Sequence, residues 1–344
     1  MLNFRRFPTV ILVLGALLAP GCKERIADNA TTEIPEINVR IEGLSSSPDE
    51  SQLAFAVIQE SPYLGVISVD TATTRTFPAP GQLETFYGIS WGPNGTSLVA
   101  TIIEESSEAF RIQKLDLRKD EWSPIVVLEE DICQRAIVSL NAEQLVFRAA
   151  IEKDLYTVDL TTGATDKLTE SGDTNRLGYA WAHDSASVYY SRNNSHGEPG
   201  IWRIDTATRS TSPVAEGITC PALALSRNGE YLAYQAEAPD GSSRLFVANA
   251  DGSNPYEICE DSGPFFTWSL GQDRIASTSD GRLEIWDATK GEAVPVELAG
   301  NTRKSHPAWL EEGRKIAAVC NENEIWIYDF DTKTQQKVFE IEKE

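Results

Sequence analysis

The sequence predicts an all-β protein that folds as a seven-bladed β-propeller with four antiparallel strands in each blade. Two observations carry this prediction: a strand pattern recurs seven times at intervals of 41–47 residues, and a tryptophan returns at one position of the pattern. Repeats of about 40–45 residues with four short strands are typical of propeller blades. The seven units fill residues 36–344, which we therefore assign to one propeller domain.

The second strand of each unit carries a hydrophobic residue at one fixed position, which we call the anchor. The seven anchors are Leu53, Leu98, Leu145, Val188, Leu232, Ile275 and Ile316. On the first strand, a tryptophan lies seven residues before four of these anchors, at Trp91, Trp181, Trp268 and Trp309. A four-stranded blade cannot bury both of its faces alone, so we expect these tryptophans to pack in the core between neighbouring blades.

The third strand of each unit ends at an aspartate or an asparagine. These residues are Asp70, Asp116, Asp159, Asp205, Asn249, Asp287 and Asp329. Aspartate and asparagine side chains bond to backbone amides two residues further along the chain and thereby stabilise turns. We therefore expect the repeated acid to be a turn residue and not a set of catalytic acids.

The fifth unit resembles the WD40-like repeat of the TolB propeller. Residues 225–258 read LSRNGEYLAYQAEAPDGSSRLFVANADGSNPYEI, and the resemblance extends over residues 36–344 in seven copies, where TolB has six. It implies the propeller fold, but it identifies no ligand, because function is carried by sites and loops on such a scaffold.

The composition is that of a folded soluble protein, with 41% hydrophobic and 24% charged residues. Lysine and arginine number 30 against 52 acids, which gives a formal charge of −22. Proteins that bind nucleic acid neutralise phosphates with clustered cations, so we expect no nucleic-acid partner. Electrostatic attraction to an anionic membrane is not expected for the same reason.

The N-terminus predicts an export signal over residues 1–21. Arg5 and Arg6 precede an apolar stretch, Val10–Ala19, of ten residues. About 20 apolar residues are needed to cross a bilayer, so this stretch does not predict a transmembrane helix.

The segment Leu18–Cys22 (LAPGC) resembles a bacterial lipobox. The resemblance implies cleavage before Cys22 and lipid attachment at that residue. An ordinary signal peptide with a chance cysteine is the alternative. Residues 22–35 are polar and aperiodic, so we expect a flexible tether. The implied location is the bacterial cell envelope, where the lipid would hold a monomer to the outer membrane, facing the periplasm.

Long polar segments between the second and third strands predict a binding face. They lie in units one, two, four and five, at residues 58–65, 102–110, 192–200 and 237–244. These loops share one end of the ring with the blade-to-blade connections, and recognition often resides in loops on a rigid scaffold. The expected exposed contacts are Tyr63, Phe110, Arg192 and His196, although the loops could equally be tolerated insertions. The sequence leaves the closure of the ring open: residues 37–41 (INVRI) could pair beside residues 335–342 and lock it.

The sequence offers few residues that could form a disulfide or bind a metal ion. Cys133, Cys220, Cys259 and Cys320 fall at sites too far apart in the blades for bridging, so we expect no disulfide. The three histidines are not expected to converge, so we predict no metal site and no cofactor. Some seven-bladed relatives are oligogalacturonate lyases, which need a histidine-based metal centre, so this inventory speaks against that activity.

Three functions remain open. The favoured one is a non-catalytic scaffold, anchored by lipid, that binds an envelope protein or polysaccharide. The second is an enzyme, lactonase-like or glycan-cleaving, with a divalent ion held by acids in the central channel. The third is a binder of small solutes or glycans, which would require aromatic side chains exposed at the channel mouth.

Overall fold

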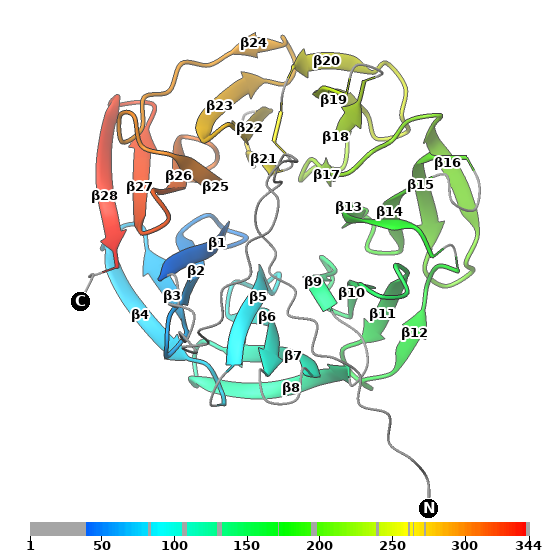
Figure 1. Ribbon diagram of the computed structural model, residues 1–344, viewed down its shortest axis with the longest axis horizontal. Helices are drawn as coiled ribbons and strands as arrows, with labels where there is room; N and C mark the ends of the chain where they lie inside the picture. Colours follow the sequence, from blue (N-terminus) through cyan, green and yellow to red (C-terminus); the bar gives the residue numbers. More distant parts are fainter. Residues whose placement is uncertain are drawn as a thin grey trace, which may run out of the picture. The chain divides into compact units, whose positions relative to one another are not determined.

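The computed structural model describes residues 39–341, except 82–83, 105–108, 129–132, 171, 194–197, 239–240, 261, 264 and 272. Within these residues the chain forms 28 strands and no helix. The strands make seven sheets of four antiparallel strands each, and in every sheet the strands pair in chain order. Figure 1 shows the sheets arranged radially, with the first strand of each blade nearest the axis and the fourth at the rim. The predicted seven-bladed propeller is confirmed.

The strand bounds of the first four blades are as follows. Blade one has β1 (Arg40–Ser46), β2 (Gln52–Ile58), β3 (Tyr63–Ser68) and β4 (Thr73–Pro78). Blade two has β5 (Glu84–Trp91), β6 (Ser97–Glu104), β7 (Ala109–Asp116) and β8 (Glu121–Leu128). Blade three has β9 (Cys133–Val138), β10 (Gln144–Ala149), β11 (Leu155–Asp159) and β12 (Thr165–Lys167). Blade four has β13 (Thr174–Trp181), β14 (Ser187–Arg192), β15 (Gly200–Asp205) and β16 (Thr211–Glu216).

The remaining three blades repeat this order. Blade five has β17 (Leu223–Leu225), β18 (Tyr231–Glu237), β19 (Ser243–Asn249) and β20 (Tyr256–Cys259). Blade six has β21 (Phe266–Trp268), β22 (Arg274–Ser279), β23 (Arg282–Asp287) and β24 (Glu292–Ala293). Blade seven has β25 (Lys304–Leu310), β26 (Lys315–Cys320), β27 (Glu324–Asp329) and β28 (Thr334–Glu340).

The core lies between blades and is centred on the second strands. All seven anchors are fully buried, and each pairs with the residue seven positions earlier on the first strand, as Leu98 pairs with Trp91. These strands are short and rich in β-branched and small apolar residues, which suits a strand that is covered on both faces.

The four tryptophans link neighbouring blades. Each donates its indole N–H to a backbone carbonyl on the inner strand of the preceding blade, as Trp309 does to Thr267 at 3.0 Å. Trp91, Trp181 and Trp268 donate in the same way to Ser45, Ile137 and Ala224. The expectation that the tryptophans pack between blades is confirmed, and the hydrogen bond explains why tryptophan suits the position, since a buried indole N–H needs an acceptor.

The repeated aspartate closes the turn between the third and fourth strands. In Asp205, for example, one carboxylate oxygen accepts the backbone N–H groups of Ala207 and Thr208 at 3.1 and 2.7 Å. Asp116, Asp159, Asp287 and Asp329 make the same kind of contact. The prediction of a turn residue is confirmed at these five positions.

The strand pairing that could have closed the ring does not form among the described residues. β1 is the inner strand of blade one and β28 the outer strand of blade seven, so described residues 39–41 do not pair beside 335–340. Each blade consists of four consecutive strands, so no strand from one end of the chain completes a sheet at the other end. Packing closes the ring instead: the Phe55 and Phe339 rings lie 4.5 Å apart between centroids, and the N–H of Ile41 donates to the carbonyl oxygen of Glu322.

Candidate functional site

The inner strands of all seven blades surround an axial cavity of about 320 Å³. It is bordered by the parts of these strands nearest the blade connections, such as Phe86–Ile89 on β5 and His306–Ala308 on β25. A second cavity, of about 310 Å³, lies toward the turns between first and second strands, around Pro48 and Pro93. Arg135 and Thr267 are among the residues that border both, so these side chains lie where the two cavities meet.

One position of the repeat determines the lining of the first cavity. The residue ten positions before the anchor is small in four units: Gly43, Gly88, Gly178 and Ala222. It is large in the other three, where it is Arg135, Phe265 and His306. Six of these seven residues border the cavity, all except Gly178. The small residues leave the centre of the cavity open. The three large side chains give the cavity a guanidinium, an aromatic ring and an imidazole.

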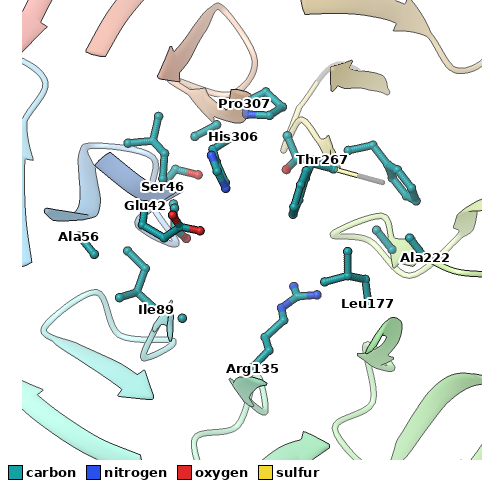
Figure 2. Close-up of a pocket in the computed structure, with 18 of the residues that line it drawn as sticks. Glu42, Ser46, Ala56, Ile89, Arg135, Leu177, Ala222, Thr267, His306 and Pro307 are labelled. Carbon is teal, nitrogen blue, oxygen red and sulfur yellow. The ribbon is translucent and has the colours of Figure 1, made fainter. Parts of the chain in front are cut away.

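Arg135 extends from β9 into the cavity, where Figure 2 shows its guanidinium group pointing toward the centre. Its carbonyl oxygen accepts the Tyr179 hydroxyl at 2.6 Å, which fixes the backbone from the next blade. Its guanidinium has no hydrogen-bond or ion-pair partner among the described residues. Arg135 is an exposed residue, but the surrounding blades partly desolvate its guanidinium, and this desolvation lowers the pKa of Arg135.

His306 and Glu42 lie on the opposite side of the cavity in Figure 2. Burial lowers the pKa of His306, because it disfavours the imidazolium, although the Glu42 carboxylate acts in the other direction. The Glu42 carboxylate is itself paired with Arg40 at 3.0 Å. His306 is therefore neutral near pH 7, and Glu42 already has a cationic partner.

Aromatic side chains border the same cavity. Phe265 is 43% exposed, and its ring lies 5.1 Å from that of His306. Tyr87 borders the cavity from blade two and packs edge-on against Phe110. The cavity thus combines an exposed aromatic face with an arginine, which is a pairing suited to binding a small molecule that has an apolar body and a negative group.

The four residues predicted from the loops do not form this site. The expectation that Phe110 is exposed is wrong: it is 3% exposed, because its ring turns inward to Tyr87. Tyr63 is half-buried at the start of β3, and burial raises its pKa. The guanidinium of Arg192 lies 4.1 Å from the Trp202 ring centre, and its Nε donates to the carbonyl of Glu198. His196 lies outside the described residues, and the other three border neither axial cavity.

The loop lengths also differ from expectation. The connection between the second and third strands of blade three, residues 150–154, is as long as that of blade five, residues 238–242. Those of blades six and seven, residues 280–281 and 321–323, are shorter, as expected. Strand pairing continues further into the segments of blades one and two than the polar sequence suggested: in blade one only residues 59–62 lie between strands, and in blade two β6 continues to Glu104 and β7 begins at Ala109.

Residues with metal-binding or redox chemistry are dispersed in the part of the chain that the structure describes. No group of three or more His, Cys, Asp or Glu side chains is placed there to hold a metal. Glu42 and His306 are the residues of these types at the first cavity. Cys133, Cys220, Cys259 and Cys320 are each buried, and none of the four forms a disulfide among the described residues. The described residues contain no helix that is long and apolar enough to span a membrane.

The sequence-based prediction missed Arg135, Phe265 and His306 as cavity residues. The signal that locates them is the register of the repeat, since they interrupt a position that is otherwise glycine or alanine. Arg176, two residues before Gly178, also borders the cavity and shows no such signal. Its position depends on the local path of β13, where the pairing with β14 is irregular between Thr174 and Tyr179.

No protein-family model and no curated protein matches the chain. Solved structures do resemble it. An oligogalacturonate lyase in complex with manganese gives a TM-score of 0.66 at 13% identity over 82% of this chain and 87% of that chain. TolB from Acinetobacter baumannii gives 0.54 at 14% identity over 90% of this chain and 65% of TolB. The β-propeller domain of Swd1 from Myceliophteria thermophila gives 0.57 at 14% identity, over 82% and 95%. At these identities the similarity shows the fold alone: this chain is a seven-bladed β-propeller similar to TolB and to propellers both with and without enzymatic activity.

Proposed function

We propose that the protein is a non-catalytic binding protein of the bacterial cell envelope, anchored by lipid at Cys22. It captures an envelope protein or polymer at the end of the ring where the blade connections and the loops between second and third strands meet. The observation that carries the proposal is the axial cavity at this end, whose lining offers an exposed aromatic ring, Phe265, and an unpaired guanidinium, Arg135. Such a lining serves recognition, since it supplies an apolar contact and directional donors.

Anchoring rests on the sequence of the export signal, because Cys22 lies outside the described residues. Two or more acyl chains hold a protein to a membrane firmly, whereas one holds it only marginally. A propeller tethered in this way keeps its binding end free to meet partners at the membrane surface. The polar tether, residues 22–35, supplies the necessary reach.

The test is in-cell crosslinking of the full-length protein, followed by mass spectrometry, with Cys22→Ser as the control. We expect Cys22→Ser to leave the membrane fraction and to lose a crosslinked partner that the unaltered protein captures. Fractionation of Cys22→Ser with the membranes would contradict anchoring. The same partner captured equally by both proteins would show that binding does not need the anchor.

The alternative is an enzyme with a divalent ion in the channel. Its support is the fold similarity to an oligogalacturonate lyase that was solved with manganese, together with the presence of His306 and Glu42 at one cavity. A resident ion stabilises the folded state by mass action, so its removal lowers the melting temperature. A fall in the melting temperature in chelator that manganese restores would favour this alternative over the scaffold.

A further inference from the structure

The axial cavity holds cationic side chains whose hydrogen-bond donors have no acceptor in the described protein. Arg135 and Arg176 both border the cavity, and neither guanidinium has a hydrogen-bond or ion-pair partner among the described residues. A guanidinium carries five N–H donors in a planar fork. Several other arginines of this acidic chain pair with carboxylates, as Arg203 does with Asp184. Both arginines are exposed, so their N–H donors are available to an anion that enters the cavity.

The other ionisable groups of the cavity do not meet this demand. Glu42 is the one carboxylate among the described lining residues, and it is paired with Arg40 at 3.0 Å. His306 is neutral near pH 7, because burial lowers its pKa. The cavity is consequently positive near Arg135, although the protein as a whole carries a formal charge of −22. The nearby Glu42 limits how much negative charge the cavity accepts, which favours a monoanion over a dianion.

The shape of the cavity restricts the rest of the ligand. About 320 Å³ lies at the lower end of the range for small-molecule sites, which is roughly 300–1,000 Å³. Gly43, Gly88 and Ala222 provide the space, and Phe265 provides an exposed flat apolar face. A molecule with one aromatic or alicyclic ring and one charged group matches this combination of size and surface.

We propose that the cavity binds a small organic carboxylate, with the carboxylate on the guanidinium fork of Arg135 and the apolar body beside Phe265. This inference deepens the proposed function, because it names the ligand class of the same binding end. Arginine recognises carboxylates through two parallel N–H···O bonds, which gives orientation as well as affinity. Arg176 adds positive charge at the same cavity.

Isothermal titration calorimetry on the purified full-length protein tests the proposal with four probes: benzoate, its neutral analogue benzyl alcohol, acetate and inorganic phosphate. We expect benzoate to bind at least about tenfold more tightly than benzyl alcohol, a difference that one charge-assisted contact accounts for. We expect benzoate also to bind more tightly than phosphate, because the cavity favours a monoanion with an apolar body.

Three variants locate the site. Arg135→Gln is expected to weaken benzoate binding at least about tenfold. Phe265→Ala is expected to weaken benzoate and to leave acetate unchanged, because acetate has no ring to contact Phe265. Arg227→Gln is the matched control: Arg227 is exposed and borders only the second cavity, so benzoate binding should not change. Thermal melting of each variant verifies that it folds.

Several outcomes would overturn the proposal. They are equal binding of benzoate and benzyl alcohol, unaltered benzoate binding in a folded Arg135→Gln, preferred binding of phosphate, or no heat with benzoate up to about 10 mM. None of these results bears on membrane anchoring or on the crosslinked partner. A failure here would leave the scaffold function standing. Failure to find any Cys22-dependent partner in the crosslinking experiment would leave the anion site standing.

Discussion

The hydroxyl of Tyr179 on β13 donates a hydrogen bond of 2.6 Å to the carbonyl oxygen of Arg135 on β9. The bond joins the inner strands of blades three and four. Tyr179 is fully buried, and this burial raises its pKa, so the phenol stays protonated and remains a donor across the physiological range. The backbone that carries the cavity arginine is thus held by a neighbouring blade and not by its own sheet alone.

Tyr179→Phe is expected to destabilise the protein by about 1–3 kcal/mol, because it leaves the partly buried carbonyl of Arg135 without this donor. Urea unfolding followed by fluorescence measures the change. Tyr256→Phe is the matched control, since the Tyr256 hydroxyl is buried and has no hydrogen-bond partner in the described structure. Removal of the Tyr256 hydroxyl should leave the free energy of unfolding unchanged or raise it slightly. Equal losses in both variants would show that the Tyr179 hydrogen bond contributes nothing specific.

The fold could be predicted from the sequence because the residues that define a blade recur from unit to unit. Each anchor and each inner-strand tryptophan recurs at one register, so the strand order follows once a single unit is recognised. The turn role of Asp205 and its equivalents was predictable for the same reason, since a side chain that bonds its own backbone needs no distant partner.

The closure and the site were harder to predict, because both depend on what differs between repeats. Ring closure depends on Phe339 meeting Phe55, a contact between the two ends of the chain that no repeat pattern encodes. Phe110 lies in a polar loop sequence, yet its ring turns inward to Tyr87. Arg135 interrupts a register of small residues, and its significance appears only when seven blades bring that register to one axis.

The ring closure makes a second prediction, on the coupling between Phe55 and Phe339. Their tilted rings, 4.5 Å apart, join blades one and seven. A double-mutant cycle with Phe55→Leu and Phe339→Leu is expected to give a coupling energy of about 0.5–1.5 kcal/mol, the range for aromatic pairs. Denaturant unfolding of the four proteins provides the values. Strict additivity of the two single changes would mean that this contact does not close the ring.

The turn aspartates predict a component of acid sensitivity. Two backbone N–H groups hold the pKa of Asp205 below its usual value, with Thr208 making the larger contribution. Because the folded pKa is lowered, this stabilisation is present above the unfolded pKa of about 3.9 and is lost as pH falls through that value toward the folded pKa.

Asp205→Ala should therefore reduce the loss of stability between about pH 5 and pH 3. Thermal melting across this range measures it. Asp70→Ala serves as the control, because Asp70 lies in the turn that follows β3 of blade one, yet its carboxylate accepts no hydrogen bond from the described residues. If Asp70→Ala reduced the loss of stability at acid pH as much as Asp205→Ala does, the turn hydrogen bonds of Asp205 would not be its cause.

His306 predicts a second pH-dependent effect, at higher pH. Burial lowers the folded pKa of His306 below the unfolded value of about 6.5, so the unfolded chain binds a proton first as pH falls. Stability attributable to His306 is complete above about pH 6.5 and declines as pH falls from there to the folded pKa. His306→Asn should lose less stability than the unaltered protein between about pH 7.5 and pH 5.

The control is His183→Asn, an exposed turn histidine whose ring nitrogen contacts the Arg227 carbonyl. It should preserve the pH dependence of the unaltered protein, as measured by denaturant unfolding at the two pH values. Glu42→Gln extends the argument, because removing the carboxylate that favours the imidazolium should lower the folded pKa of His306 further and steepen the decline. A Glu42→Gln variant with a shallower decline would mean that the carboxylate does not act on His306 in the folded cavity.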